Sequence, residues 1–420
     1  MRPNCLLSIF LLLLLLWLPS TYFLLVDDEL RPEVPELLKI TGSQRPEVDN
    51  YYIQAMRLAE PLLDEQQILQ LYVSAERVDL FTPRRRWPEL DMLDALYQHP
   101  LLCELIDREC RAFLIEHEEE INQLLEDFEG MLRHYEQMQQ LSNIRSIDEL
   151  NVSVNWVGLL ALERIYALAI FQLIQQSQLE LAEQKLTVWV KQQRKLINVP
   201  SRLFVSSLFF HKVDTLFLPL AYELKQHHSG PLPELAMELT PLNHNELTAL
   251  SSKKFELAET LFVHKDAFEA QGLDGRGIWK RLMLKPNLSL NWLYQNHWDG
   301  SGTEIMDPKQ WYFEVLARRS VEESTATNLL AALRSKLRRY RNYVGSSVTE
   351  SFIISLDMHA LERIRTDSLL HLYQRYLRYD MGDIDDKSLP AFQENPYTGE
   401  PAFYHDHQWC YRLDQLICLP

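Results

Sequence analysis

Apolar positions along most of the chain recur with the period of an α-helix. Three strongly apolar segments, at 156–176, 178–197 and 202–228, predict core helices. A predicted helix over about 104–141 carries a seam of apolar residues spaced alternately three and four apart. The members of this seam are Ile121, Leu124, Phe128, Met131, Tyr135 and Met138. The seam is a heptad pattern and predicts an antiparallel helical hairpin. Because no fixed repeat relates the helices, we expect an irregular array of antiparallel helices.

The amino terminus carries the longest uncharged stretch, residues 6–26. About 20 apolar residues suffice for a helix that spans a bilayer. Arg2 precedes the stretch and Asp27, Asp28 and Glu29 follow it, which predicts a single span with the body outside the cytoplasm. A cleaved signal peptide is the alternative, and it would release the body from the membrane. The small residues that signal cleavage requires are poorly represented before residue 27.

Composition narrows the fold class and the partners. The chain has only 12 glycines among 420 residues, too few for the many tight turns of a β-sandwich or barrel, so we expect an all-α protein. Its formal net charge is −17, which argues against a nucleic-acid partner. The composition changes after residue 270, where glycine and tryptophan become frequent, and again after residue 380.

These changes predict five regions. They are a transmembrane signal-anchor at 1–27, a helical domain at 28–270, a Gly/Trp-rich loop segment at 271–310, a helical region at 311–380 and an irregular or short β tail at 381–420. The tail is rich in large apolar side chains, so we expect it to dock on the helical body rather than to hang free.

Four cysteines follow the apolar stretch, which permits two disulfides in an oxidising compartment. On an intact helix Cys103 and Cys110 would lie about 10 Å apart, too far to bridge. Cys410 and Cys418 lie in the irregular tail and can bridge more easily. Free buried cysteines are the alternative for all four.

Three clusters have residue types that suit a ligand, and each also has a plain structural explanation. In the tail, His405, His407 and Cys410 are candidate zinc ligands, because two histidines two apart point the same way on an extended strand. An exposed tail explains the same residues. No cofactor is predicted.

The Gly/Trp-rich segment combines aromatic and short polar side chains, which suit a sugar or a peptide. The candidates are Trp279, Asn287, Asn291, Trp292 and Trp298. Packing of the segment by its own tryptophans is the alternative.

A predicted amphipathic helix near 333–341 presents a basic face that would attract an anionic partner. Its cations are Arg334, Lys336, Arg338, Arg339 and Arg341. Pairing with acidic groups of the same chain is the alternative.

Two motifs resemble elements of known envelope proteins. They are Pro286-Asn-Leu-Ser-Leu-Asn291 and Asn395-Pro-Tyr-Thr-Gly-Glu-Pro401. Both are similar to elements in a loose group of uncharacterised, N-terminally anchored, helical envelope proteins of Gram-negative bacteria, and the tail also resembles that of type II secretion pseudopilins. The prepilin cleavage signature is missing from the amino terminus. The resemblance implies an inner-membrane anchor and a periplasmic body, and it implies no reaction.

The sequence therefore favours a binding or scaffolding protein of the bacterial envelope, with another protein or a cell-wall component as its partner. An envelope hydrolase that acts on a glycan or peptide is a second hypothesis. An accessory role in secretion or pilus machinery is a third.

Overall fold

A computed structural model describes most of the body of the protein. The described residues are 27–39, 47, 49–59, 66–67, 96, 98–144, 156–201, 203–228, 230–270, 285–298, 307–322, 359–378, 394–405 and 408–419. The predicted anchor at 6–26, Trp279, His407 and the basic face at 334–341 lie outside these ranges.

The chain folds into two compact units that are interleaved along the sequence. The smaller comprises Met1–Ser43, Lys254–Gly302 and Ser320–Leu356, and the larger comprises Gln44–Lys253, Thr303–Arg319 and Asp357–Pro420. Each unit has a hydrophobic core of its own.

The core of the smaller unit is built by α2 (Glu33–Leu38), α15 (Leu250–Ala270) and α17 (Pro286–Trp298). Its buried members are Val34, Leu37, Leu257, Ala258, Leu261, Leu290, Trp292, Leu293 and Tyr294. The expectation of a loop across 271–310 is wrong at α17. The glycines that suggested a loop lie outside this helix, and Pro286 suits its first turn.

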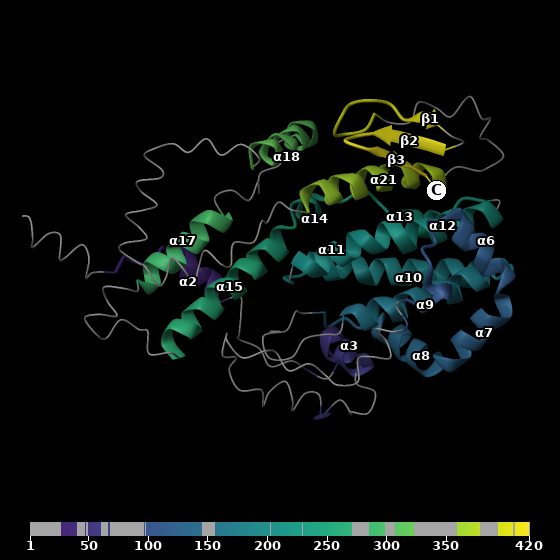
Figure 1. Cartoon of the computed structure of the whole chain (residues 1–420), viewed down its shortest axis with the longest axis horizontal. Coiled ribbons are helices and arrows are strands. Elements are labelled where there is room, and N and C mark those ends of the chain that lie inside the picture. The colour runs from purple at the N-terminus through teal and green to yellow at the C-terminus, as the bar shows by residue number, and fades with distance from the viewer. Residues whose placement is uncertain are drawn as a thin grey trace, which may run out of the picture. The chain divides into compact units, whose positions relative to one another are not determined.

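The larger unit is a helical array whose centre is formed by three long helical segments (Figure 1). They are α9 (Trp156–Gln175), α10 (Leu179–Asn198) and the run α11 (Leu203–Lys212), η2 (Val213–Phe217) and α12 (Leu218–His227). The other helices among the described residues of this unit are α3 (Tyr51–Ala59), η1 (Pro100–Leu102), α6 (Arg108–Glu116), α7 (Glu118–Asp127), α8 (Glu129–Met138), α13 (Pro233–Glu238), α14 (His244–Thr248), α18 (Pro308–Glu322, which ends outside this unit) and α21 (Ala360–Arg378). The sequence predicted the three central segments to within a few residues.

By length and composition, the segments Trp156–Gln175 and Leu203–His227 could each cross a membrane. In the structure 72% of each apolar window is buried within the protein. Both helices therefore have the burial predicted for core helices.

The single helix predicted over 104–141 is in fact three helices, α6, α7 and α8. The chain leaves helical geometry at His117 and again at Phe128. The seam survives these bends, because Ile121, Leu124 and Tyr135 are buried. The bends let α7 and α8 both pack against α9, while α8 also packs against α3. A straight helix could not follow that curved surface.

The tail forms a three-stranded antiparallel sheet of β1 (Phe403–His405), β2 (Gln408–Arg412) and β3 (Leu416–Cys418), in that order. Strands β2 and β3 pack against α21, so the predicted docking of the tail is seen in the structure. All strands among the described residues belong to this sheet.

Both disulfides are present, one between Cys410 and Cys418 and one between Cys103 and Cys110. The expectation that Cys103 and Cys110 lie too far apart is wrong, because their Cα atoms are 5.9 Å apart. Cys103 has an extended conformation and precedes α6, which begins only at Arg108.

Candidate functional site

The motif Pro286–Asn291 contacts the segment that directly follows the apolar stretch. We call residues 27–31 the arm and the side chains of Asn287 and Asn291 on α17 the asparagine socket. Arm and socket both belong to the smaller unit.

Asp27 caps the amino end of α17. The first N–H groups of a helix have no partner within the helix and carry a partial positive charge. One carboxylate oxygen of Asp27 accepts from the backbone N–H of Asn287 at 2.9 Å, and the other accepts from that of Leu288 at 3.2 Å. The capping residue thus lies about 260 positions earlier in the sequence.

The two asparagines hold the backbone of the arm beyond this cap. Asn287 Nδ2 donates to the carbonyl of Asp28 at 2.9 Å. Asn291 Nδ2 donates to the carbonyl of Glu29 at 2.8 Å, and its Oδ1 accepts from the N–H of Arg31 at 2.9 Å. Asn291 therefore pairs with the arm as a neighbouring strand would, with one donor and one acceptor.

Removing the cap should loosen the arm. We expect Asp27→Ala to destabilise the docked arm by about 1–2 kcal/mol. This corresponds to a roughly 5–30-fold rise in the equilibrium constant for undocking of the arm from α17. Hydrogen exchange at the amides of Asn287 and Leu288 would measure it. Glu33→Gln is the matched control, because Glu33 is an exposed acid on α2. Equal exchange in both variants would contradict the capping role.

A buried polar network lies at the centre of the larger unit. Lys212 Nζ on α11 is 2.7 Å from Glu163 Oε1 on α9, and both side chains are almost fully buried. Tyr135 donates its hydroxyl to the same Glu163 oxygen at 2.8 Å and accepts from Trp189 Nε1 at 2.8 Å. Lys212 also donates to Gln193 Oε1 at 2.6 Å. Burial raises the pKa of Tyr135 well above its ordinary value, and the Glu163 carboxylate raises it further, so Tyr135 stays a proton donor.

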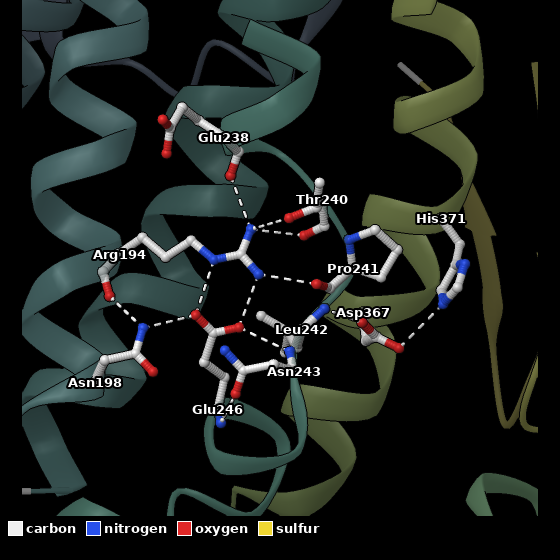
Figure 2. Close-up of polar contacts among 10 residues, drawn as sticks. All are labelled: Arg194, Asn198, Glu238, Thr240, Pro241, Leu242, Asn243, Glu246, Asp367 and His371. Carbon is white, nitrogen blue, oxygen red and sulfur yellow. Dashed lines mark hydrogen bonds and ion pairs between the residues drawn. The ribbon is translucent and has the colours of Figure 1, made fainter. Parts of the chain in front are cut away.

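Arg194 on α10 ties down the connection between α13 and α14 (Figure 2). Its guanidinium makes a bidentate contact with Glu246, at 2.8 Å from Nε and 2.7 Å from Nη2. The same group donates to the carbonyls of Glu238, Thr240 and Pro241, each at 2.8 Å. Glu246 also completes a capping box with Asn243 at the start of α14. The charge of Arg194 is therefore balanced by an acid of the same unit and has a structural role.

Asp367 on α21 joins this connection to the tail. One oxygen of its carboxylate accepts from the N–H of Leu242 at 2.5 Å, and the other accepts from the Tyr397 hydroxyl at 2.9 Å. Figure 2 also shows His371 Nε2, which lies 3.5 Å from the second oxygen. Tyr397 belongs to the motif Asn395–Pro401, so this motif helps to dock the tail on α21.

The turn of that motif explains its asparagine and glycine. Asn395 Oδ1 accepts from the N–H of Tyr397 at 2.8 Å, and the N–H of Gly399 donates to the Asn395 carbonyl at 2.7 Å. Gly399 has a φ of 72°, which a residue with a side chain rarely adopts.

One carboxyl with an unusual pKa lies on the π-helical stretch η2. Burial raises the pKa of Asp214 to about 7, with a further contribution from the Glu362 carboxylate, while a hydrogen bond from Thr366 opposes the shift. The side-chain oxygens of Asp214 and Thr366 are 3.3 Å apart. In the sequence Asp214 is a single acid within the apolar segment 202–228. Its π-helical setting could not be seen from the pattern.

The other predicted site residues are distributed as follows. Cys410 is bonded to Cys418, so its sulfur is not a thiolate ligand, while His405 is exposed at the end of β1. Among the described residues, no three His, Cys, Asp or Glu side chains gather as a metal site. Trp292 is buried in the core of the smaller unit, and Trp298 ends α17. Trp279, His407 and the basic face stay predictions.

A separate cleft of about 430 Å³ opens on the larger unit between α3 and α8. Its lining is Asp49, Gln54, Arg57, His134, Gln137, Met138 and Leu141. The sequence did not predict it, because its two walls come from helices that are far apart along the chain.

Comparison of the chain with protein-family models, with curated proteins and with solved structures finds no match.

Proposed function

We propose that this chain is a single-pass protein of the bacterial inner membrane whose helical body lies in the periplasm and binds or scaffolds another protein or a cell-wall component. Residues 6–26 are its membrane anchor. The observation that carries the proposal is the docked arm. The first residues after the apolar stretch are held by the asparagine socket, so the smaller unit would be held close to the bilayer.

The two disulfides support the compartment. Disulfides persist in the periplasm and are rare in the reducing cytosol. Both bridges lie in the body of the protein, at Cys103–Cys110 and Cys410–Cys418. The envelope hydrolase has less support, because the socket asparagines contact the arm of the protein itself and Cys410 is oxidised.

A topology experiment tests the proposal. Alkaline phosphatase folds into its active form only outside the cytoplasm, so we expect a fusion after Pro420 to be active. The control is the same fusion with residues 2–26 deleted, which should be made and remain inactive. An inactive but stable full-length fusion would defeat the proposed topology.

The mass of the purified protein then separates the anchor from a signal peptide. A retained anchor predicts the mass of the whole chain. A mature amino terminus between residues 18 and 30 would instead show cleavage and a body released into the periplasm.

A further inference from the structure

A disulfide-stapled turn presents an isoleucine to solvent. The Cys103–Cys110 bridge closes the loop that precedes α6. Within it the N–H of Asp107 donates to the carbonyl of Glu104 at 2.9 Å, which forms a tight turn with Ile106 near its tip. The side of the turn that faces inward is anchored by the buried Leu105, and Ile106 is 44% exposed.

A buried arginine fixes the shape of this turn. Arg111 Nη1 donates to the carbonyls of Leu105 and Ile106, at 2.7 and 3.1 Å. Its Nε lies 2.7 Å from Glu223 on α12, so the arginine is itself held in place. Staple, turn and arginine together leave the tip few conformations, and such preorganisation lowers the entropy lost on binding.

A second exposed stretch lies on α6. Arg108, Ala112 and Ile115 are spaced four and three apart, which aligns them on one side of the helix, and all are exposed. Ile115 is 56% exposed. We call Ile106, Arg108, Ala112 and Ile115 the stapled face. Its helical part is about 10 Å long.

Acidic residues flank the stapled face along the chain. Residues 104–120 contain seven acidic residues and two arginines. Arg111 is paired with Glu223, and Glu104 lies 3.9 Å from Arg164 on α9, which leaves six acids against Arg108. All seven acids are exposed, namely Glu104, Asp107, Glu109, Glu116, Glu118, Glu119 and Glu120. A partner with complementary charge must be basic where it meets this rim.

We propose that the stapled face binds a second periplasmic protein, through a shallow apolar pocket that is rimmed by lysine or arginine side chains. The proposal rests on the proposed function, because it needs the body to lie in the periplasm. An anionic lipid surface is disfavoured, since the acidic rim would repel its headgroups. A glycan is disfavoured because the stapled face has no aromatic side chain on which a sugar could stack.

Photo-crosslinking in cells tests the contact. A benzophenone amino acid would replace Ile106 or Ile115 in the full chain. Met237 on α13 is the matched control position, because it is 62% exposed and belongs to the same unit. We expect a single adduct with another protein from positions 106 and 115 and none from 237. Adding Glu116→Lys, Glu119→Lys and Glu120→Lys should abolish it.

The crosslinked protein, once identified by mass spectrometry and purified, provides the quantitative test. Its affinity for the full chain should fall at least tenfold with Ile106→Ser and less than twofold with Met237→Ser. Joint replacement of Cys103 and Cys110 by serine should also weaken binding, because the turn loses its preorganisation.

Several outcomes would overturn the proposal. They are equal adducts at 106 and 237, an adduct with lipid, an adduct with a second copy of this chain, and an adduct that survives the charge reversal. The alkaline phosphatase fusion distinguishes failure of the stapled-face proposal from failure of the proposed periplasmic location. An active fusion without an adduct rejects the stapled face alone, whereas an inactive stable fusion rejects the periplasmic location first.

Discussion

Lys212→Met should lower the free energy of unfolding by about 3–5 kcal/mol, because it leaves the Glu163 carboxylate buried without its cation. The ammonium and the carboxylate lie 2.7 Å apart, and neither side chain has appreciable contact with solvent. Methionine retains most of the volume of the lysine stem, so the expected loss is electrostatic rather than a packing defect. Urea unfolding of the purified full-length chain, followed by circular dichroism, would measure it.

A double variant distinguishes charge from packing. Glu163→Gln combined with Lys212→Met removes both charges, and the glutamine oxygen can still accept from the Tyr135 hydroxyl, which now donates to Glu163 at 2.8 Å. We expect the double variant to recover most of the stability lost in the single one. If both variants unfold at the same urea concentration, the destabilisation comes from packing and the ion pair has little part in it.

This pair shows how far the sequence could lead. Glu163 and Lys212 each interrupt a strongly apolar helix, and a charge at that depth is costly in lipid, which favours a core helix over a membrane span. Pairing one with the other requires knowledge of which faces of α9 and α11 meet. Local periodicity contains no such information, because it fixes the buried face of each helix and not the neighbour that covers it.

The ends of a helix were predictable where a long apolar pattern defines it. Helices α9 and α10 begin and end close to the predicted residues, because their apolar patterns are long. Neither bend has a proline, and Gly130, two residues after Phe128, is the one local signal that the sequence offers near either of them. At these bends α7 and α8 both pack against α9, and such tertiary contacts have no signature in the local pattern.

The two asparagines of the socket were among the residues that the sequence analysis selected. Asn287 and Asn291 were marked as candidates for an external sugar or peptide, and the structure shows them bound to the backbone of the arm. The same amide chemistry serves both purposes. Asp27 entered the sequence argument only as a charge that sets topology, because a cap some 260 residues from its helix has no local signature.

Deleting residues 391–420 should lower the free energy of unfolding of the larger unit by about 4 kcal/mol. The deletion exposes apolar surface to water and removes a hydrogen-bond donor from a buried carboxylate. The deletion uncovers the side of α21 on which β2 and β3 pack. It also removes the Tyr397 hydroxyl from Asp367, and it removes the ring contacts of Tyr397 with Trp311 and Tyr312 on α18. Cys410 and Cys418 leave together, so no unpaired thiol complicates the comparison.

Two smaller changes in the full chain calibrate that loss. Tyr397→Phe keeps the ring but removes the hydroxyl, and it should cost about 1–3 kcal/mol because Asp367 stays buried. His405→Ala alters an exposed side chain at the end of β1 and should change stability by less than about 0.5 kcal/mol. Calorimetric melting of the three variants should therefore give the order deletion, Tyr397→Phe, His405→Ala from the least to the most stable. If the truncated chain melts at the temperature of the whole one, the tail is an independent appendage. The pair His405 and His407 would then become a stronger candidate for a functional site.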